Sequence, residues 1–108
     1  MVSRVIMTDL AQSQLDSYIE YLLIEKSSPQ AAKAIKDDAL LTVEALLLSA
    51  DTLAYCDDDD LTALGYRKIH FSKHRYLFLY RIVEDIAYIE AVYHQLQDYE
   101  NIFKKTVA

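Results

Sequence analysis

The sequence predicts an α+β fold with an N-terminal strand, an antiparallel helical hairpin and a three-stranded antiparallel meander, the helices lying on one face of the sheet. Apolar residues recur with the period of a helix over 9–50 and with the two-residue period of a strand over 66–93. Helices that precede an antiparallel meander are typical of this fold class. With 108 residues, 53% of them apolar, we expect a single domain over 1–108.

The first elements are a strand and a helix. Ser3–Met7 is short and contains β-branched residues, which favour a strand. Thr8 follows, and its hydroxyl can accept a free backbone N–H at the start of a helix. Leu15, Ile19 and their neighbours form one apolar stripe, so we expect a helix from this point to about Lys26.

A second helix is expected over 29–50. Pro29 fits the first turn of a helix, where its missing N–H is not needed, and Ser28 is a suitable cap before it. Ile35, Ala39 and Leu46 then recur on one side. Because the connection between the two helices is short, they should pack as an antiparallel hairpin.

The segment 51–65 interrupts the helical pattern with four consecutive aspartates, Asp57–Asp60. Like charges repel and favour solvent, so we expect a solvated loop. A calcium loop is the alternative, but the segment lacks the alternating carboxylates and the central glycine of such a site.

Three strands are expected over 66–71, 76–83 and 86–93, followed by a short helix that includes Ile102 and Phe103. Strict alternation along the third strand would place Glu90, Val92 and His94 on one face. Alternation alone does not decide which face of the sheet meets the helices. The face turned away from them is expected to be open and available for function.

Charge is unevenly distributed along the chain. The net charge is −6, and residues 1–60 hold four Lys or Arg against twelve Asp or Glu, whereas 61–108 hold seven against five. Residues 65–82 carry five Lys or Arg and no carboxylate. The acidic total argues against a general nucleic-acid-binding protein, but a local basic segment can still bind phosphate.

The remaining composition indicates a cytoplasmic protein. Cys56 is the only cysteine, which suits a reducing compartment. The N-terminal sequence lacks the apolar core of a signal peptide, and no apolar run reaches the ~20 residues that a membrane helix needs. We expect no membrane association.

The three histidines are candidates for general acid–base chemistry on a phosphodiester, with arginine or lysine stabilising the phosphate charge. Their spacing lacks a closely spaced ligand pair, so we expect no metal and no other cofactor. The alternative is that they are exposed strand residues without a catalytic role. They are His70, His74 and His94.

Segments along almost the whole chain resemble the RelE/ParE superfamily of type II toxin–antitoxin toxins, also called plasmid stabilization proteins. The resemblance is carried by "DLAQSQLDSYIEYLL", "SPQAA", "LGYRKIHF", "LFLYRI" and "IAYIEAVYHQLQD". It implies a small antiparallel sheet with two helices on one face.

The resemblance implies two alternative activities. RelE-like and YafQ-like members are metal-independent endoribonucleases that cut mRNA on the ribosome, and ParE-like members inhibit DNA gyrase without established catalytic residues. The paired helices and "SPQAA" are more ParE-like, and the histidines are more like the nucleases. The net charge departs from the ribosome-directed pattern, as does the acidic linker "ADTLAYCDDDD", Ala50–Asp60.

The resemblance also implies individual roles. His94 matches the late histidine of the nucleases, His70 matches a sheet histidine of YafQ-like members, and His74 falls on the acidic position that follows it there. Arg67 and Arg75 match arginines that are common in the superfamily. The implied catalytic set is His94, His70, His74 and Arg67, and the implied substrate-binding set is Arg75, Lys68, Lys73 and Arg81.

The resemblance implies a cognate antitoxin as partner, with the ribosome and its mRNA or DNA gyrase as target. A homodimer and a hetero-oligomer with the antitoxin both remain open. The alternative function is a non-catalytic binding module, or an inactive homologue, on the same fold.

Overall fold

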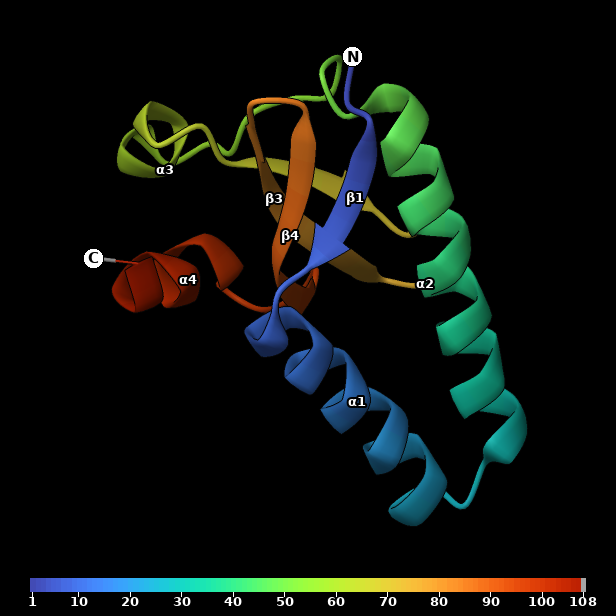
Figure 1. The fold of residues 1–108 in the computed structure, drawn as a ribbon. Coiled ribbons are helices and arrows are strands. Elements are labelled where there is room, and N and C mark those ends of the chain that lie inside the picture. Colours follow the sequence, from blue (N-terminus) through green and yellow to red (C-terminus); the bar gives the residue numbers. More distant parts are fainter. Residues whose placement is uncertain (108) are drawn as a thin grey trace.

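The computed structural model describes residues 1–107 and confirms the predicted α+β class (Figure 1). A central sheet has the long helices α1 and α2 on one side and the short helices α3 and α4 toward the other. Within the described residues, no helix is long and apolar enough to cross a membrane. The elements are β1 (Arg4–Met7), α1 (Asp9–Ile24), α2 (Pro29–Ser49), α3 (Asp59–Ala63), β2 (Arg67–His70), β3 (Tyr76–Val83), β4 (Ile86–His94) and α4 (Tyr99–Val107).

Local capping chemistry sets the helical hairpin. The Thr8 hydroxyl accepts the Ala11 N–H at 3.3 Å, and the Ser28 hydroxyl accepts the Ala31 N–H at 3.3 Å, as the sequence predicts. The first helix ends at Ile24, slightly before the predicted position. Ser27 then takes a left-handed conformation with φ 47°, which turns the chain into α2.

The sheet has the strand order β1-β4-β3-β2. The predicted meander of β2, β3 and β4 is antiparallel. However, β1 pairs with β4 in parallel, which corrects the fully antiparallel sheet that the resemblance implied. The chain passes from β1 through α1, α2 and α3 before it enters β2, and β1 and β2 are the two edges of the sheet.

Both faces of the sheet are covered, at least in part. Ile69, Phe78 and Val92 pack against α1 and α2 on one face. On the other face, Leu61 of α3 and Phe103 of α4 lie in one buried cluster with Tyr66, which precedes β2, and with residues of β3 and β4. The expectation that this second face is open is therefore wrong along much of its surface, because α3 and α4 each place a large apolar side chain on it.

A bulge in β4 changes the predicted alternation. Leu79 pairs with Ala91 and Tyr80 pairs with Ile89, so Glu90 is an extra residue opposite this step. Glu90 accepts a hydrogen bond from Tyr66 of the second face, whereas Val92 packs in the cluster on the α1–α2 face. The prediction that Glu90 shares a face with Val92 and His94 is therefore wrong.

The aspartate run begins a helix and is not simply a solvated loop. The Asp58 carboxylate accepts the backbone N–H groups of Asp60 at 2.9 Å and Leu61 at 3.0 Å, and so caps α3. Negative charge is favourable at a helix N-terminus, which explains why consecutive aspartates are tolerated here. Leu61 is fully buried beneath them.

Candidate functional site

His70 and His94 lie on opposite faces of the sheet. Both flank β3 at the same end, since His70 pairs with Leu77 and His94 pairs with Tyr76. His70 follows Ile69, which packs toward α1 and α2, so the pleat directs the exposed His70 side chain to the other face. His94 contacts Tyr76 on the α1–α2 side, with the ring centroids 5.1 Å apart. The sheet therefore separates these two side chains.

His94 is part of a small hydrogen-bonded cluster at the end of β4. Its Nδ1 accepts the Leu96 N–H at 3.1 Å, so a neutral ring carries its proton on Nε2. The Gln97 Oε1 accepts the His94 N–H at 2.9 Å and the Tyr18 hydroxyl at 3.0 Å. The Tyr18 ring in turn lies edge-on to Tyr76 at 4.9 Å. His94 is partly exposed, and its position is fixed by these contacts.

The tyrosines beside His94 remain protonated at neutral pH. Burial, followed by the neighbouring Tyr76, raises the pKa of Tyr18. Burial, followed by Tyr21, raises the pKa of Tyr76. Both phenols can therefore donate hydrogen bonds but are poor proton acceptors.

His74 is bound to the buried carboxylate of Asp38. The Asp38 side chain is 1% exposed, and its Oδ2 lies 2.7 Å from His74 Nδ1. The backbone N–H groups of Ser72 and Lys73 also donate to Asp38, at 3.2 and 3.0 Å. Burial alone would raise the pKa of Asp38, but the hydrogen bonds from His74, Lys73 and Ser72 outweigh it and lower that pKa. Asp38 thereby anchors the β2–β3 loop to α2.

Sequence reasoning assigned no role to Asp38. Asp38 lies on the buried side of α2, which also carries Ile35, Ala39 and Thr42. A carboxylate inside an apolar stripe was the signal that could have found it, because such a group must have partners when it is buried.

Arg67 holds the linker that precedes α3. Its Nη1 donates to the Leu53 carbonyl and its Nη2 donates to the Tyr55 hydroxyl, each at 2.8 Å. The guanidinium carbon also lies 4.1 Å from the centroid of the Tyr55 ring. Arg67 therefore contacts the chain's own linker through both its donors and its flat surface.

Lys68 is shielded between the linker and α4. Its side chain is 15% exposed, and Nζ lies 3.3 Å from Asp57 and 3.4 Å from Glu100. It also donates to the Tyr99 hydroxyl at 3.3 Å. Burial alone would lower the pKa of Lys68, but the contacts with Tyr99, Asp57 and Glu100 outweigh it and raise that pKa.

Arg81, like Arg67 and Lys68, is bound to another group of this chain, the carboxylate of Glu90. Its Nε donates to Glu90 Oε2 at 2.7 Å, and the Tyr66 hydroxyl donates to Glu90 Oε1 at 3.0 Å. Burial and the adjacent Glu90 raise the pKa of Tyr66 to about 12. The bulge that places Glu90 on this face is thus what completes the cluster.

Lys73 and Arg75 differ from the other predicted cations. Both side chains are exposed in the β2–β3 loop, and neither has an ion-pair partner within residues 1–107. The Arg75 carbonyl accepts the Gln95 N–H at 2.8 Å, which brings the Arg75 backbone beside the end of β4. Among the eight predicted residues, Arg75 and His94 thus lie in neighbouring segments at one end of the sheet.

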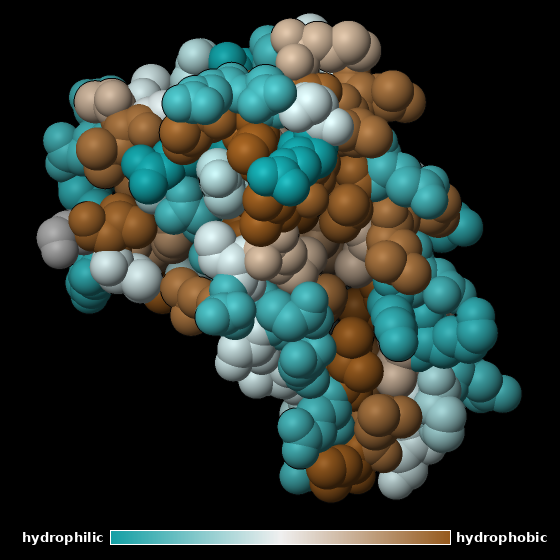
Figure 2. Space-filling view, in the orientation of Figure 1, coloured by the Kyte–Doolittle hydropathy of each residue, from teal (hydrophilic) through white to brown (hydrophobic). Residues whose placement is uncertain are grey.

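A shallow apolar groove runs between α1 and α2. Figure 2 shows hydrophobic surface between the two helices, bordered by hydrophilic side chains. The groove encloses about 320 Å³ and includes Met7 of the edge strand β1 in its lining. The lining residues are Met7, Gln12, Leu15, Asp16, Ile19, Lys36, Ala39, Leu40 and Val43.

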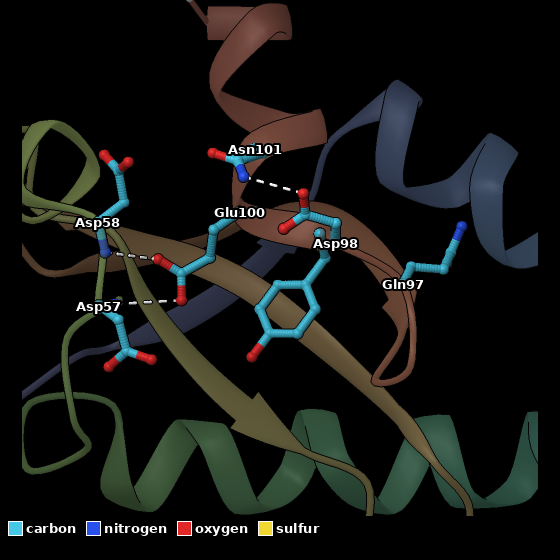
Figure 3. Close-up of a pocket in the computed structure, with 7 residues that line it drawn as sticks. Asp57, Asp58, Gln97, Asp98, Glu100 and Asn101 are labelled. Atoms are coloured by element: carbon cyan, nitrogen blue, oxygen red, sulfur yellow. Dashed lines mark hydrogen bonds between the residues drawn. The ribbon is translucent and has the colours of Figure 1, made fainter.

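An acidic hollow of about 430 Å³ lies between the linker and the start of α4 (Figure 3). Glu100 points across it and accepts the backbone N–H groups of Asp57 at 3.1 Å and Asp58 at 2.7 Å. Within residues 1–107, no three His, Cys, Asp or Glu side chains are placed to share a metal ion. The Glu100 carboxylate therefore binds backbone N–H groups of this chain and so connects α4 to Asp57 and Asp58.

Comparison with known proteins identifies the family. Residues 5–99 match the model of the ParE toxin of the type II toxin–antitoxin system parDE. No curated protein matches the chain significantly. A solved structure, the chromosomal ParDE toxin–antitoxin system from P. aeruginosa, is similar over 84% of this chain and 94% of its own, with 19% identity and a TM-score of 0.66. Because the family model spans most of the sequence, this chain belongs to the ParE toxins of type II toxin–antitoxin systems.

Proposed function

We propose that this ParE-family toxin acts by binding and inhibiting DNA gyrase, and that it does not cleave mRNA. The observation that carries the proposal is the separation of the three histidines. His70 and His94 lie on opposite sheet faces, and His74 is bound to Asp38. Concerted acid–base catalysis needs the proton carriers around one reacting phosphate, within hydrogen-bond reach.

The internal use of cations supports the same proposal. Arg67, Lys68 and Arg81 each contact carbonyl, hydroxyl or carboxylate groups of this chain. Cleavage of a phosphodiester requires cations directed at the developing negative charge. The net charge of −6 also disfavours approach to RNA, whereas it is no obstacle to binding a protein surface.

The proposal is tested with purified toxin in two assays, gyrase-catalysed DNA supercoiling and cleavage of mRNA on purified ribosomes. We expect inhibition of supercoiling and intact mRNA. His94→Ala should inhibit supercoiling as strongly as the unaltered toxin, after circular dichroism has shown that it folds. Cleavage of mRNA that His94→Ala abolishes would overturn the proposal.

A second candidate function, cleavage of mRNA, is favoured by the arrangement at the end of β4. The partly exposed His94 has its Nδ1 occupied, which leaves Nε2 for proton transfer, and the exposed Arg75 lies in the neighbouring segment. In this alternative, His94 would carry the proton and Arg75 would bind the phosphate, with Lys73 nearby. Loss of such a proton carrier typically lowers the rate by about 10²–10⁴-fold.

We further propose that the cognate antitoxin covers the groove between α1 and α2. The groove is mostly apolar, has polar residues among those that line it and lies beside the edge strand β1, and these features suit an amphipathic segment. Gln12→Arg, at its rim, should weaken antitoxin binding, because a long charged side chain would enter the groove. Ser13→Arg, the exposed neighbour that does not line the groove, is the matched control. Equal binding by both variants would place the antitoxin elsewhere.

A further inference from the structure

The outward side of α2 carries a regular pattern that neither the sheet nor α1 uses. Acidic residues recur at seven-residue spacing, at Asp37, Glu44 and Asp51, and a pair of leucines stands in each interval. We call these seven residues, six in α2 and Asp51 just beyond its end, the outer leucine face of α2: Asp37, Leu40, Leu41, Glu44, Leu47, Leu48 and Asp51.

The leucines of this face are exposed to solvent. Leu40, Leu41, Leu47 and Leu48 are 57%, 48%, 38% and 74% exposed, whereas the residues of α2 that pack on the protein include Ile35, Ala39 and Leu46, each at most 4% exposed. Positions three and four apart lie on adjacent turns of one side of a helix, and positions seven apart lie two turns apart on that side, so these leucines and Glu44 share one side. Figure 2 shows hydrophobic surface where the C-terminal half of α2 lies in Figure 1. Clustered exposed leucines of this kind mark an interaction surface.

Among the seven residues of this face, the one charge without an ion-pair partner in the described part of the chain is negative. Asp37 is paired with Lys33 at 2.6 Å, and Asp51 lies 3.5 Å from the N-terminal amine. Glu44, which is exposed between the two leucine pairs, has no ion-pair partner within residues 1–107. A helix that packs here therefore meets leucines at heptad spacing, with an unpaired carboxylate between them.

We propose that the outer leucine face of α2 is a docking surface for a partner helix that is both apolar and basic. Leucine pairs at heptad spacing fit the apolar seam of a second helix, and lysine or arginine on that helix complements the unpaired Glu44. A second copy of this chain fits poorly, because two such faces packed antiparallel about Glu44 would bring the two Glu44 carboxylates together. The surface meets the α1–α2 groove only at Leu40, so this inference goes beyond the antitoxin site proposed above.

The probe is a synthetic helical peptide of about three heptads, with leucine along one side and lysine beside it, labelled for fluorescence anisotropy. The comparison peptide has glutamate at each lysine position. We expect the lysine peptide to bind at least about tenfold more tightly than the glutamate peptide, and its affinity to fall as salt is added. Amide chemical shifts should change along α2.

Two pairs of variants distinguish binding at the outer leucine face from nonspecific binding of the peptide to the acidic protein. Leu41→Ser with Leu48→Ser should weaken binding of the lysine peptide by about a hundredfold, because two apolar contacts are lost. Leu96→Ser, which removes a leucine that is 74% exposed outside α2, is the matched control and should bind normally. Glu44→Lys should weaken binding, whereas Glu20→Lys, the same change of charge at an exposed position of α1, should not.

Three results would overturn the proposal. The first is absence of binding by the lysine peptide. The second is equal weakening by Glu44→Lys and Glu20→Lys, which would indicate attraction to the acidic molecule as a whole. The third is self-association of the unaltered toxin in sedimentation equilibrium that Leu41→Ser with Leu48→Ser abolishes, since the occupant would then be a second copy. None of these measurements uses gyrase or the antitoxin.

Discussion

Asp38 is a carboxylate in the buried side of α2, where it holds the β2–β3 loop through His74 and two backbone N–H groups. A buried charge is tolerated only when it is paired and hydrogen-bonded. Removing its charge therefore affects the whole loop that carries Lys73 and Arg75. A single residue, Asp38, thus connects α2 to the loop that carries the exposed Lys73 and Arg75.

Asp38→Asn should lower the free energy of unfolding by about 3 kcal/mol, because a buried carboxylate that is hydrogen-bonded to His74, Ser72 and Lys73 is lost. Urea denaturation measures the change. The matched control is Asp37→Asn, the preceding residue, which loses only an exposed pair with Lys33 worth roughly 0.3–0.5 kcal/mol. Equal effects of the two substitutions would contradict a structural role for the buried carboxylate.

The pKa of Asp38 gives this contribution a defined pH dependence. That pKa is lower in the folded protein than its ordinary value of 3.8, so the unfolded chain binds the proton more readily. The stabilisation is therefore fully present above 3.8 and is lost as the pH falls through the folded value. The difference in unfolding free energy between the unaltered protein and Asp38→Asn should shrink as the pH is lowered below 4, in urea titrations repeated at each pH. A constant difference over this range would argue against the assigned pair.

In the β3–β4 turn, a residue with a side chain occupies a backbone conformation that favours glycine. The two strands are joined by Glu84 and Asp85, and Glu84 takes a positive φ of 58°. This conformation is unfavourable for residues with a Cβ and is the usual place for glycine in a two-residue hairpin loop. The strands impose it, since β3 and β4 pair up to Val83 and Ile86.

Glu84→Gly should raise the free energy of unfolding by about 0.5–1 kcal/mol, because glycine relieves the positive φ at a small entropic cost. Thermal and urea unfolding give the value. Glu84→Ala is the control, since it removes the same carboxylate but keeps the Cβ. Should both substitutions stabilise equally, the gain would come from the lost charge and not from the backbone.

The elements themselves could be predicted because their signals are local. Thr8, Ser28 and Pro29 mark the helix starts through hydrogen bonds to residues three positions away or through a fixed φ. The Glu90 bulge could not be predicted, since it depends on how β4 pairs with β3. Likewise, the packing of Phe103 against Tyr66, with the rings 4.9 Å apart, joins segments that no sequence period connects.

The candidate site was less predictable than the fold for the same reason. The sequence identified the residue types, and the resemblance assigned them roles. Their partners, however, come from distant segments, as with Asp38 for His74, Leu53 for Arg67 and Glu100 for Lys68. A spacing pattern contains no information about such contacts, so it could not separate exposed cations from those engaged inside the molecule.

Across the whole molecule, the basic segment 65–82 supplies cations to carboxylates that stand elsewhere in the chain. Arg81 pairs with Glu90 on the next strand, and Lys68 pairs with Asp57 of the linker and Glu100 of α4. This accounts for a segment without carboxylates in an acidic protein: its acidic partners arrive through tertiary contacts. Lys68 is the most central case, because it connects β2, the linker and α4.

Lys68→Met should therefore destabilise the protein by about 2 kcal/mol, since Glu100 would remain shielded without its cation. Amide hydrogen exchange should rise in α4 and in the linker before the rest of the molecule opens. Lys73→Met, in the same basic segment but exposed, should change stability by no more than about 0.5 kcal/mol. If Lys73→Met is as damaging as Lys68→Met, the segment acts through its overall charge. If only Lys68→Met loosens α4, the basic segment acts through specific contacts with carboxylates of its own chain.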